Sequence, residues 1–510
     1  MPIPILNATQ AAAWDERART SAAIPSRVLM EGAGRAVAQL LARDFPSQLE
    51  HGVLIAAGHG NNGGDGWVVA RALGAVGVRV WVAELDRERS PDCEANRKLA
   101  LEEGVQLLAS DAAWPEAGIV VDALLGTGAS GEPHGAIGEL AQRVARQRGP
   151  VVAVDGPTGL DLSTGEALGP VRADLTVTFG GARRGHLLAR EWCGRIVIAD
   201  IGFPPPEPDW PTLFTDSDAG ALLPPFSAEM HKGDRGRVVI IGGDEGMAGA
   251  ALHAASAAFA AGAGLVKIAA SAVTVQAAQT VLPDALSVAT GLGRSLEPEL
   301  VEAIEWADAL VLGPGLGRGE DRSAFIEAVL ECAAAPVVID ADALHAGAAL
   351  AAGDAPRVLT PHPGEFQAAF PGLGAALEED RFAAASAAAP ENAGPSSVLL
   401  KGVPTVIAAP GRPLRVVATG NPALATGGSG DLLAGFIAAF LARGLEPFDA
   451  AGLGAFTLGR AAELAAAQHT VRATRPADVL AAVPDLWRRL AAPPAFAPPV
   501  LFELPSPAVV

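Results

Sequence analysis

From about residue 50 onward, short runs of β-branched hydrophobic residues alternate with Ala- and Leu-rich stretches of helical length. In the first half of the chain these runs occupy residues 53–58, 78–85, 119–126, 151–159, 175–181 and 196–202. Such an alternation is typical of a parallel sheet that is covered by helices on both faces. The pattern therefore predicts an α/β, Rossmann-like fold for the first half.

A proline-rich segment separates this alternation from a second one. Residues 203–211 read FPPPEPDWP, and clustered prolines favour a stiff extended connection. A second alternation runs from residue 237 to residue 420, so the second half is also predicted to be a doubly wound α/β domain. A chain of 510 residues suits two domains. We expect domains at 1–212 and 213–492, and a loosely packed or disordered Pro-rich tail at 493–510.

Charge and composition narrow the classes of partner. The chain has 37 Lys and Arg residues against 57 Asp and Glu residues, a net charge of −20, and no basic run that would suit nucleic acid. Half of the residues are hydrophobic, but alanine supplies much of this share. The longest uncharged helical stretch, residues 246–266, is mainly Ala and Gly and contains His253, so it is predicted to be a buried helix of a soluble protein. Neither nucleic acid nor a membrane is expected as a partner.

The N-terminus and the cysteines indicate a cytoplasmic protein. The chain reaches Asp15 and Glu16 without a basic segment or a long apolar segment, so no secretory signal is expected. Cys93, Cys193 and Cys332 lie far apart and show no CxxC spacing. Neither a disulfide framework nor a thiolate metal site is expected, and the thiols are interpreted as buried and inert.

A glycine-rich segment after the first predicted strand, GHGNNGGDG at residues 58–66, is the first candidate site. Gly58, Gly60 and Gly63 satisfy the GxGxxG pattern, and Glu84 ends the next predicted strand. Taken alone, this indicates an NAD-dependent oxidoreductase. However, two amides and a carboxylate at 61–65 crowd the place where a pyrophosphate needs free backbone N–H groups, and they favour a cation or a hydroxyl group. The alternative is that the glycines only form a tight strand-to-helix turn.

Two more glycine-rich loops with acidic residues, DALLGTGASGE and VDGPTGLDLSTG, follow later strands. Ligands of open α/β sheets bind at the carboxyl ends of the strands, which makes Asp122, Asp155 and Asp200 candidates by position. The oxygens of Asn62, Asp122 and Thr158 suit a monovalent cation such as K⁺ better than Mg²⁺ or a transition metal. Asp155 would then be free for the substrate. Each aspartate could instead only cap the turn after its strand.

Four motifs in order, AIPSRVLMEGAGRAVA, NNGGDG, VDALLGTG and VDGPTGLD, resemble the N-terminal epimerase domain of the bifunctional NAD(P)H-hydrate repair enzymes. The resemblance covers most of residues 5–205. It implies interconversion of the R and S forms of hydrated NADH and NADPH (NADHX and NADPHX), with K⁺ held by Asn62, Asp122 and Thr158, and with Asp155 as the catalytic residue. The implied substrate contacts are Asn61, Asn62, Gly63, Gly64, Asp65, Gly126, Thr127, Gly128, Ala129, Ser130, Gly131, Glu132 and Asp155.

The second candidate site is a glycine-rich loop near the end of the second domain, at residues 419–444. The successive N–H groups of residues 427–430, at the start of an apolar helix, form an anion cradle that the helix dipole stabilises. Asp431 beside this cradle would take a proton from a substrate hydroxyl while the backbone amides hold the phosphate being transferred. The GxGD arrangement resembles the ribokinase-like superfamily. The alternative is a simple capped helix start.

Other strand ends are predicted to reach the same crevice. LLKGVPT places Lys401 and the Gly402 backbone beside the cradle, where they could meet a nucleotide. The turns GPGLG and TPHPGEF end two further strands. His362 is held between two prolines, which suits a positioned donor to the substrate, although a surface histidine in a stiff turn is the alternative.

Seven motifs in order are similar to the dehydratase domain of the same repair enzymes, over about residues 225–490: HKGDRGRVVIIGG, GMAGAALHAASAAFAAGAGLVKI, GPGLG, VVIDADALHA, LTPHPGE, LLKG and GNPALATGGSGD. The resemblance implies dehydration of the S hydrate with Mg²⁺ and ADP, which becomes AMP and phosphate, or with ATP as in some relatives. The implied catalytic residue is Asp431. The implied hydrate contacts are Ala250, Gly317, His362 and Asp431, and the implied nucleotide contacts are Lys401, Gly402, Val403, Pro404, Thr405 and Gly430.

The sequence departs from the family pattern at a few of these motifs. Thr158 stands where Ser is usual and keeps the hydroxyl, whereas Gly156 replaces a β-branched residue and loosens a strand end. His345 replaces a common Asn, and Ala423 and Leu424 replace Gly-Met. None of these departures removes an implied catalytic group.

Together the resemblances predict a metabolite-repair enzyme with an epimerase and a dehydratase on one chain. NADHX, NADPHX and ADP are its expected small-molecule partners, and a homo-oligomer is its expected state. Three alternatives stay open: a small-molecule kinase that releases a stable phosphorylated product, an NAD-dependent dehydrogenase, and a non-catalytic nucleotide-binding regulator.

Overall fold

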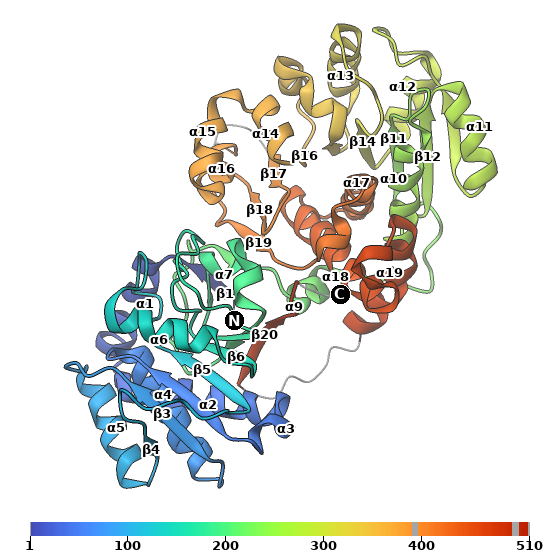
Figure 1. The fold of residues 1–510 in the computed structure, drawn as a ribbon. Helices are drawn as coiled ribbons and strands as arrows, with labels where there is room; N and C mark the ends of the chain where they lie inside the picture. Colours follow the sequence, from blue (N-terminus) through green and yellow to red (C-terminus); the bar gives the residue numbers. More distant parts are fainter. Residues whose placement is uncertain (1, 390–395, 492–498, 508–510) are drawn as a thin grey trace. The chain divides into compact units, whose positions relative to one another are not determined.

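The computed structural model describes residues 2–389, 396–491 and 499–507 (Figure 1). The chain divides into two compact units between Pro211 and Thr212, one residue before the expected boundary. Unit 1 comprises the residues up to Pro211 together with a segment near the C-terminus, and unit 2 comprises the residues between them. Within the described ranges, no helix is long and apolar enough to span a membrane.

Unit 1 contains the Rossmann-like sheet that the hydrophobic pattern predicts. Its strands are β2 (Val53–Ala57), β3 (Val80–Glu84), β4 (Gln106–Leu107), β5 (Ile119–Ala123), β6 (Val151–Val154), β7 (Leu175–Phe179), β9 (Arg195–Ala199) and β20 (Val500–Leu504). They lie in the order β4-β3-β2-β5-β6-β7-β9-β20, and all neighbouring pairs except β9 and β20 are parallel. The first six strands thus follow the 3-2-1-4-5-6 order of the Rossmann fold, which confirms the predicted class.

Helices cover both faces of this sheet because successive strand residues point to opposite sides. Val53 and Ile55 pack into one apolar cluster with Trp67, whereas Ala56 packs into another with Leu140. The first cluster lies under α2 (Ser26–Asp44), α4 (Asn61–Gly74) and α5 (Pro91–Glu102), and the second under α6 (Gly135–Ala145). The remaining elements of unit 1 are β1 (Ile3–Leu6), α1 (Ala8–Thr20), α3 (Pro46–Leu49), β8 (Ala182–Arg183), α7 (Arg184–Leu188) and α8 (Arg190–Cys193).

The strand order reverses between β2 and β5, and their carboxyl ends therefore open a crevice. The backbone is crowded there: a Cβ atom on Gly58 would lie 2.0 Å from the Leu124 carbonyl oxygen, and one on Gly63 would lie 1.9 Å from that of Gly58. These contacts require glycine at both positions. The NNGGD segment accordingly begins α4 directly, with Gly60 as its N-cap.

The expectation of a loosely packed or disordered Pro-rich tail at 493–510 is wrong for residues 500–504. Residues 500–504 form β20, which pairs antiparallel with β9 and buries Phe502 and Leu504. The alternation of polar and apolar residues is short here and is flanked by prolines, so it gives a weak strand signal. Residues 493–498 and 508–510 of the expected tail lie outside the described residues.

Unit 2 contains a second doubly wound sheet. Its strands are β10 (Thr212–Leu213), β11 (Arg237–Ile241), β12 (Leu265–Ala270), β13 (Leu286–Ala289), β14 (Ala309–Leu312), β15 (Val337–Ile339), β16 (Arg357–Leu359), β17 (Ser396–Leu400), β18 (Thr405–Ala408) and β19 (Arg415–Val417). Their order is β13-β12-β11-β14-β15-β16-β17-β18-β19-β10. The strands from β13 to β17 are all parallel, and β18 is antiparallel to both of its neighbours.

Both faces of this sheet are also covered. The helices of unit 2 are α9 (Asp216–Leu222), α10 (Ala248–Ala260), α11 (Ala272–Val281), α12 (Pro298–Trp306), α13 (Glu320–Cys332), α14 (Pro363–Ala369), α15 (Gly374–Glu379), α16 (Arg381–Ala387), α17 (Ser429–Leu441), α18 (Pro447–Ala473) and α19 (Pro476–Ala491). Val238 and Ile240 join the apolar cluster under α10, α17, α18 and α19, while Val239 and Ile241 join the cluster under α12 and α13. Short 3-10 turns are η1 (Ala341–His345), η2 (Gly347–Ala351), η3 (Pro371–Leu373) and η4 (Pro422–Leu424).

The buried helix expected over 246–266 is longer than the helix in the structure, α10. Helix α10 ends at Ala260, the chain turns at Gly262 with a φ of +105°, and strand β12 begins at Leu265. The stretch has no charge to mark a boundary, so only its glycines signal the turn.

We expect Phe502→Ala to destabilise unit 1 by about 3 kcal/mol, because it opens a cavity where β20 packs on the sheet. Phe502 is 5% exposed, whereas the neighbouring Leu501 is 36% exposed. The matched variant Leu501→Ala should therefore change the stability by less than about 0.5 kcal/mol. Denaturant unfolding followed by tryptophan fluorescence measures both values, and equal effects would contradict the packing of β20.

Two candidate active sites

Asp155 lies at the carboxyl end of β6, in the middle of the first-unit site. Its backbone adopts a left-handed conformation with a φ of +64°, and its N–H donates to the Val177 carbonyl oxygen at 2.8 Å. Such a conformation is unfavourable for a residue with a side chain and occurs mainly where the surroundings enforce it, as at functional sites.

The Asp155 carboxylate is held by protein donors on both oxygens. The Thr127 N–H and hydroxyl donate to Oδ2 at 2.7 Å and 2.5 Å, the Thr178 hydroxyl donates to Oδ1 at 3.2 Å, and the Arg183 guanidinium lies 3.5 Å from Oδ1. Burial opposes ionisation, but Arg183 and Thr127 outweigh it and lower the pKa of Asp155. Asp155 is therefore a fixed anion and not the free acceptor that the sequence indicated.

Asp122 and Thr158, two of the expected K⁺ ligands, are in direct contact. The Thr158 N–H and hydroxyl donate to the two oxygens of Asp122, each at 2.7 Å, and the Leu124 N–H donates to Oδ1 at 3.3 Å. Asp122 is fully buried. Burial raises its pKa to about 6, although the hydrogen bonds from Thr158 oppose that shift.

Asn62, the third expected ligand, has a buried side-chain amide whose oxygen and nitrogen find no hydrogen-bond partner within the described chain. A Cβ atom on Gly126 would lie 3.3 Å from Asn62 Oδ1 and 3.0 Å from Asp155 Oδ2, so both side chains face the same glycine. An unsatisfied buried amide costs about 1–3 kcal/mol, which a bound ion or ligand could offset. Among the residues described, no group of three His, Cys, Asp or Glu side chains is arranged as a metal site.

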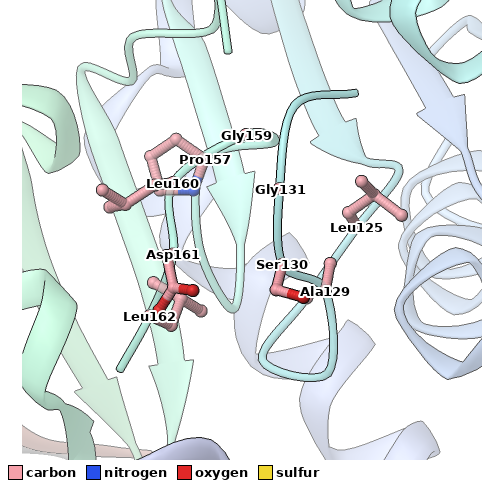
Figure 2. Close-up of a pocket in the computed structure, with 10 residues that line it drawn as sticks. Leu125, Ala129, Ser130, Gly131, Pro157, Gly159, Leu160, Asp161 and Leu162 are labelled. Atoms are coloured by element: carbon pink, nitrogen blue, oxygen red, sulfur yellow. The ribbon is translucent and has the colours of Figure 1, made fainter. Parts of the chain in front are cut away.

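A small pocket lies beside these residues, between the loops that follow β5 and β6 (Figure 2). It is lined by Leu125, Gly126, Ala129, Ser130, Gly131, Pro157, Gly159, Leu160, Asp161 and Leu162. Four expected substrate contacts, at 126 and 129–131, are among them, whereas Gly128 and Glu132 are not. The lining residues on the other side, Pro157 and 159–162, were not expected to touch the substrate, although they belong to the VDGPTGLDLSTG loop.

Two further carboxyl groups act on this site electrostatically. Asp65, in the first turns of α4, has a pKa raised well above its usual range by burial and by the negative charges of Asp155 and Asp15. Asp15, on α1, keeps an exposed surface, but partial desolvation by neighbouring chain raises its pKa, with Arg183 opposing and Asp155 adding to the shift. The environment thus shifts the pKa values of Asp155 and Asp65 in opposite directions, a division typical of acid–base sites. Asp15 was not expected, since it lies on a helix outside every glycine-rich motif.

His186, on α7, was also not expected. Its Nε2–H donates to the Asp155 carbonyl oxygen at 2.7 Å, and its Nδ1 accepts the Arg183 N–H at 3.0 Å. The ring is buried, which lowers its pKa to about 4. These partners hold His186 as a neutral ring with its proton on Nε2.

Two candidates from the sequence are engaged elsewhere. Arg97 forms a two-pronged ion pair with Glu84 at 2.6 Å and 2.8 Å, and Arg89 lies 3.0 Å from the same carboxylate. Glu84 is therefore not available to a ribose, which weakens the dinucleotide-binding alternative. Asp200 is exposed and accepts the Gly202 N–H at 2.9 Å, so it only caps a turn.

The second-unit site is built on the N-terminus of α17. Gly428 is its N-cap with a φ of +98°, a conformation suited to glycine, and the helix begins at Ser429. The Ser429 hydroxyl donates back to the Leu424 carbonyl oxygen at 2.9 Å. The helix start lies where the sequence predicts an anion cradle, since the backbone N–H groups of a first turn have no partner within their helix, and Asp431 is the third residue of the helix.

Consecutive strand ends bring an ion-pair cluster beside this cradle. Lys401, after β17, lies 2.9 Å from Asp340 Oδ1, after β15, and 3.3 Å from Glu365 Oε2, on α14. The Thr360 hydroxyl, after β16, donates to Asp340 Oδ1 at 2.7 Å. A Cβ atom on Gly430 would lie 3.6 Å from Lys401 Nζ and 3.7 Å from Asp340 Oδ2, so the two expected nucleotide contacts Lys401 and Gly430 are neighbours.

Asp431 differs from the other carboxyl groups in this cluster. Burial and the negative charge of Asp340 raise its pKa to about 7, and Lys401 only partly opposes this. For Lys401, burial favours the neutral amine, but Asp340 and Glu365 outweigh it and raise its pKa. The site thus contains a permanently charged ammonium group and a carboxyl group that titrates near neutrality, as a general base requires.

His362 caps helix α14. Its Nδ1 accepts the Gly364 and Glu365 N–H groups at 3.0 Å and 3.3 Å, so Nε2 carries the proton of the neutral ring. Its side chain is 56% exposed. His362 Nε2 lies 3.3 Å from Glu365 Oε1, so both ring nitrogens face groups of the same turn. This geometry agrees with a histidine that stiffens a turn, and the role as a donor to the substrate stays a prediction.

The remaining expected contacts fall into two places. A Cβ atom on Gly315 would lie 3.3 Å from Ala250 Cβ and 2.9 Å from Met247 Cβ, and one on Gly317 would lie 3.9 Å from Met247 Cε, so Ala250 and Gly317 are close together. The segment 402–405 forms the turn into β18, in which Gly402 and Val403 are exposed, Pro404 is buried and Thr405 is partly exposed.

Asp340 and Glu365 were not expected as site residues, although both stand in motifs that the sequence analysis quotes. Asp340 has the same signal as Asp155, an acidic residue directly after a buried parallel strand. Glu365 has no such signal, because its place follows from the cap that His362 makes on α14.

Comparisons with known proteins agree with the two-unit division. The family described as YjeF-related protein N-terminus matches residues 26–185, and the family described as NAD(P)H-hydrate dehydratase matches residues 238–485. The bifunctional NAD(P)H-hydrate repair enzyme Nnr of Moorella thermoacetica is 37% identical over 517 residues, which cover 95% of this chain and 97% of the relative. The Nnr enzyme of Escherichia coli is 37% identical over 460 residues, which cover 88% of this chain and 87% of the relative.

Solved structures similar to part of the chain include the ADP/ATP-dependent NAD(P)H-hydrate dehydratase of Bacillus subtilis, co-crystallised with ATP and Mg²⁺. It is 31% identical, has a TM-score of 0.49, and the match covers 55% of this chain and 98% of that one.

We expect His186 to stay neutral, with its proton on Nε2, throughout the range from pH 5.5 to 8. Because its pKa of about 4 lies below the unfolded value of 6.5, the unfolded chain binds the proton more tightly, and the stability of unit 1 should fall as the pH drops from about 6.5 towards 4. Nitrogen chemical shifts of ¹⁵N-histidine-labelled protein, assigned with the variant His186→Gln, test the tautomer. A His186 signal that titrates near pH 6.5 would contradict the buried placement.

Proposed function

This chain belongs to the family of bifunctional NAD(P)H-hydrate repair enzymes, and on that premise we propose how its two units divide the repair. Unit 1 interconverts the R and S hydrates of NADH and NADPH, and unit 2 dehydrates the S hydrate at the expense of a nucleotide. The observation that carries the proposal is Asp431, a carboxyl group with a pKa of about 7 placed beside a helix N-terminus and a charged lysine.

Dehydration needs help because the hydroxyl at C6 of the hydrated ring is a poor leaving group. In our proposal Asp431 accepts the hydroxyl proton while the C6 oxygen attacks the terminal phosphorus of the nucleotide, so that ADP becomes AMP. The backbone N–H groups at the start of α17 hold the transferred phosphoryl group. The phosphate then leaves C6, a proton leaves C5, and a C5–C6 double bond restores NADH or NADPH.

Lys401 and Mg²⁺ would share the negative charge of the nucleotide. Lys401 is charged, and its neighbours Asp340 and Glu365 keep it beside Gly430. Mg²⁺ usually keeps several waters and binds through substrate phosphates with few protein ligands. When bound, it would neutralise charge that develops on the phosphoryl oxygens.

Epimerisation at C6 can use the two carboxyl groups of unit 1 whose pKa values shift in opposite directions. Asp65, whose pKa is raised well above its usual range, would protonate the C6 hydroxyl, so that water leaves while the ring nitrogen lone pair forms a C6–N1 double bond. Asp155 is a fixed anion that would stabilise the positive charge of this ring. Return of water to the opposite face gives the other epimer and restores the proton to Asp65.

The donor set of Asn62, Asp122 and Thr158 fits K⁺. Asn62 offers a buried amide oxygen without a partner, and Asp122 and Thr158 offer a carboxylate and a hydroxyl in contact with each other. Hard oxygen donors with one formal charge suit a monovalent cation. When bound, K⁺ would supply a positive charge that orders the loops after β2, β5 and β6.

The proposal includes NADHX, NADPHX and ADP as substrates, with ATP as the alternative donor, and a homo-oligomer in the cytoplasm as the working form. A native mass measurement tests the assembly.

We expect recovery of absorbance at 340 nm when the protein is mixed with an R and S mixture of hydrated NADH, Mg²⁺, K⁺ and a nucleotide. Both epimers should be consumed faster than they interconvert spontaneously, and parallel samples with ADP, with ATP and without nucleotide identify the donor. Replacing K⁺ by Na⁺ should slow consumption of the R form only. Absence of recovery with either nucleotide would remove the dehydratase proposal and leave a kinase of another substrate.

Asp431→Asn should lower dehydratase turnover by roughly 100-fold or more, because the amide cannot accept the hydroxyl proton. Since only the ionised carboxylate accepts a proton, kcat/KM of the unchanged enzyme should rise with pH through about 7 and then level off. Stopped assays with pure S hydrate from pH 5.5 to 9 measure both effects. Near-normal turnover of the variant would rule out Asp431 as the base.

A further inference from the structure

Arg183 links the Asp155 carboxylate to the loop that carries Thr127. Its side chain is buried, with 9% of its surface exposed. Nε donates to Thr127 Oγ1 at 2.9 Å, Nη1 donates to the Gly181 carbonyl oxygen at 2.9 Å, and Nη2 lies 3.5 Å from Asp155 Oδ1. All three nitrogens of the guanidinium therefore have a protein partner.

The Thr127 hydroxyl completes a closed ring of contacts. It has one proton, and the ionised Asp155 carboxylate 2.5 Å away can only accept, so that proton lies between Thr127 and Asp155. Arg183 can only donate, and its Nε–H fills a lone pair of the same hydroxyl oxygen. Asp155, Thr127 and Arg183 thus hold one another in a single arrangement of donors and acceptors.

The backbone of Asp155 is held from the same segment of chain. The His186 ring donates to the Asp155 carbonyl oxygen and accepts a hydrogen bond from the backbone N–H of Arg183. Residues 183–186 therefore contact both the main chain and the side chain of Asp155. This offsets the cost of the left-handed backbone at Asp155, which is of order 1–3 kcal/mol at such positions.

We propose that Arg183 and His186 are positioning residues of the epimerase site, which act on the hydrate only through Asp155 and Thr127. The inference rests on the epimerase function proposed for unit 1. Thr127 stands near the start of the 126–132 loop, and its bonds to Asp155 tie that loop to the end of β6. Arg183 therefore sets both the place of the anion and the place of the loop that lines the pocket.

A direct contact of Arg183 with the hydrate is the competing role, and the two roles predict different kinetics. A residue that binds the substrate affects KM, and one that touches the 2′-phosphate of NADPHX affects that hydrate more than NADHX. A residue that aligns the catalytic anion affects kcat, and a misplacement of about 1 Å can lower the rate on the order of 100-fold.

The test uses the full chain with pure R hydrate and no nucleotide, so that the dehydratase is silent and chromatography reports epimerisation alone. We expect Arg183→Met to lower kcat about 10- to 100-fold, with KM changed less than about threefold and equally for both hydrates, and Thr127→Val to lower kcat by a similar factor. Thr127→Ser, which keeps the hydroxyl, should recover most of the activity. Arg183→Lys should recover little, because an ammonium group keeps the charge but lacks the planar fork.

The double variant Arg183→Met/Thr127→Val should lose little more epimerase activity than either single variant, because both substitutions remove the same hydrogen bond between Arg183 and Thr127. His186→Gln, whose amide can still donate to Asp155, should retain more activity than His186→Leu. Arg172→Met is the matched control, since Arg172 is exposed on unit 1 and pairs with Glu191 away from this ring, and it should epimerise normally.

Dehydration of pure S hydrate by the same samples shows that each chain is intact, and the thermal transition of unit 1 shows that this unit is folded. Additive losses in the double variant, an increase in KM alone, or a loss confined to NADPHX would overturn the positioning role. If the unchanged enzyme does not epimerise the R hydrate, the proposed function of unit 1 fails instead, which is a separate result.

Discussion

Buried parallel strands end in places where water is scarce, and an acidic residue at such an end needs donors, a cation or a proton. Both units are organised around this requirement. Thr158 supplies donors to Asp122, Thr127 and Arg183 hold Asp155, and Thr360 and Lys401 hold Asp340. Because each partner comes from a different loop, satisfying these carboxyl groups also assembles the loops that form the sites.

Two carboxyl groups lack such full compensation, and both are proposed to transfer protons in catalysis. Asp431 lies near Lys401, but Asp340 already engages that ammonium group, so Asp431 keeps a pKa of about 7. Burial and the carboxyl groups of Asp155 and Asp15 raise the pKa of Asp65 well above its usual range. A carboxyl group left without full compensation destabilises the fold, and its persistence is a physical mark of function.

The sequence predicted the features that depend on local pattern. The Rossmann-like class of unit 1, the glycine-rich turn at 58–63 and the helix start that places Asp431 in a first turn all follow from hydrophobic runs and turn residues. It did not predict Arg183 and His186, because their roles depend on partners 28 to 56 positions away that only the sheet brings close. It also missed β20, whose short pattern gains stability only from pairing with β9.

The return of β20 to the first sheet has a consequence for biosynthesis. Most of unit 1 leaves the ribosome first, but its last strand is made only after the whole of unit 2. At ordinary rates of translation this delay is on the order of tens of seconds. During that interval β9 lacks its partner β20, and an unpaired strand edge is a template for pairing with another chain.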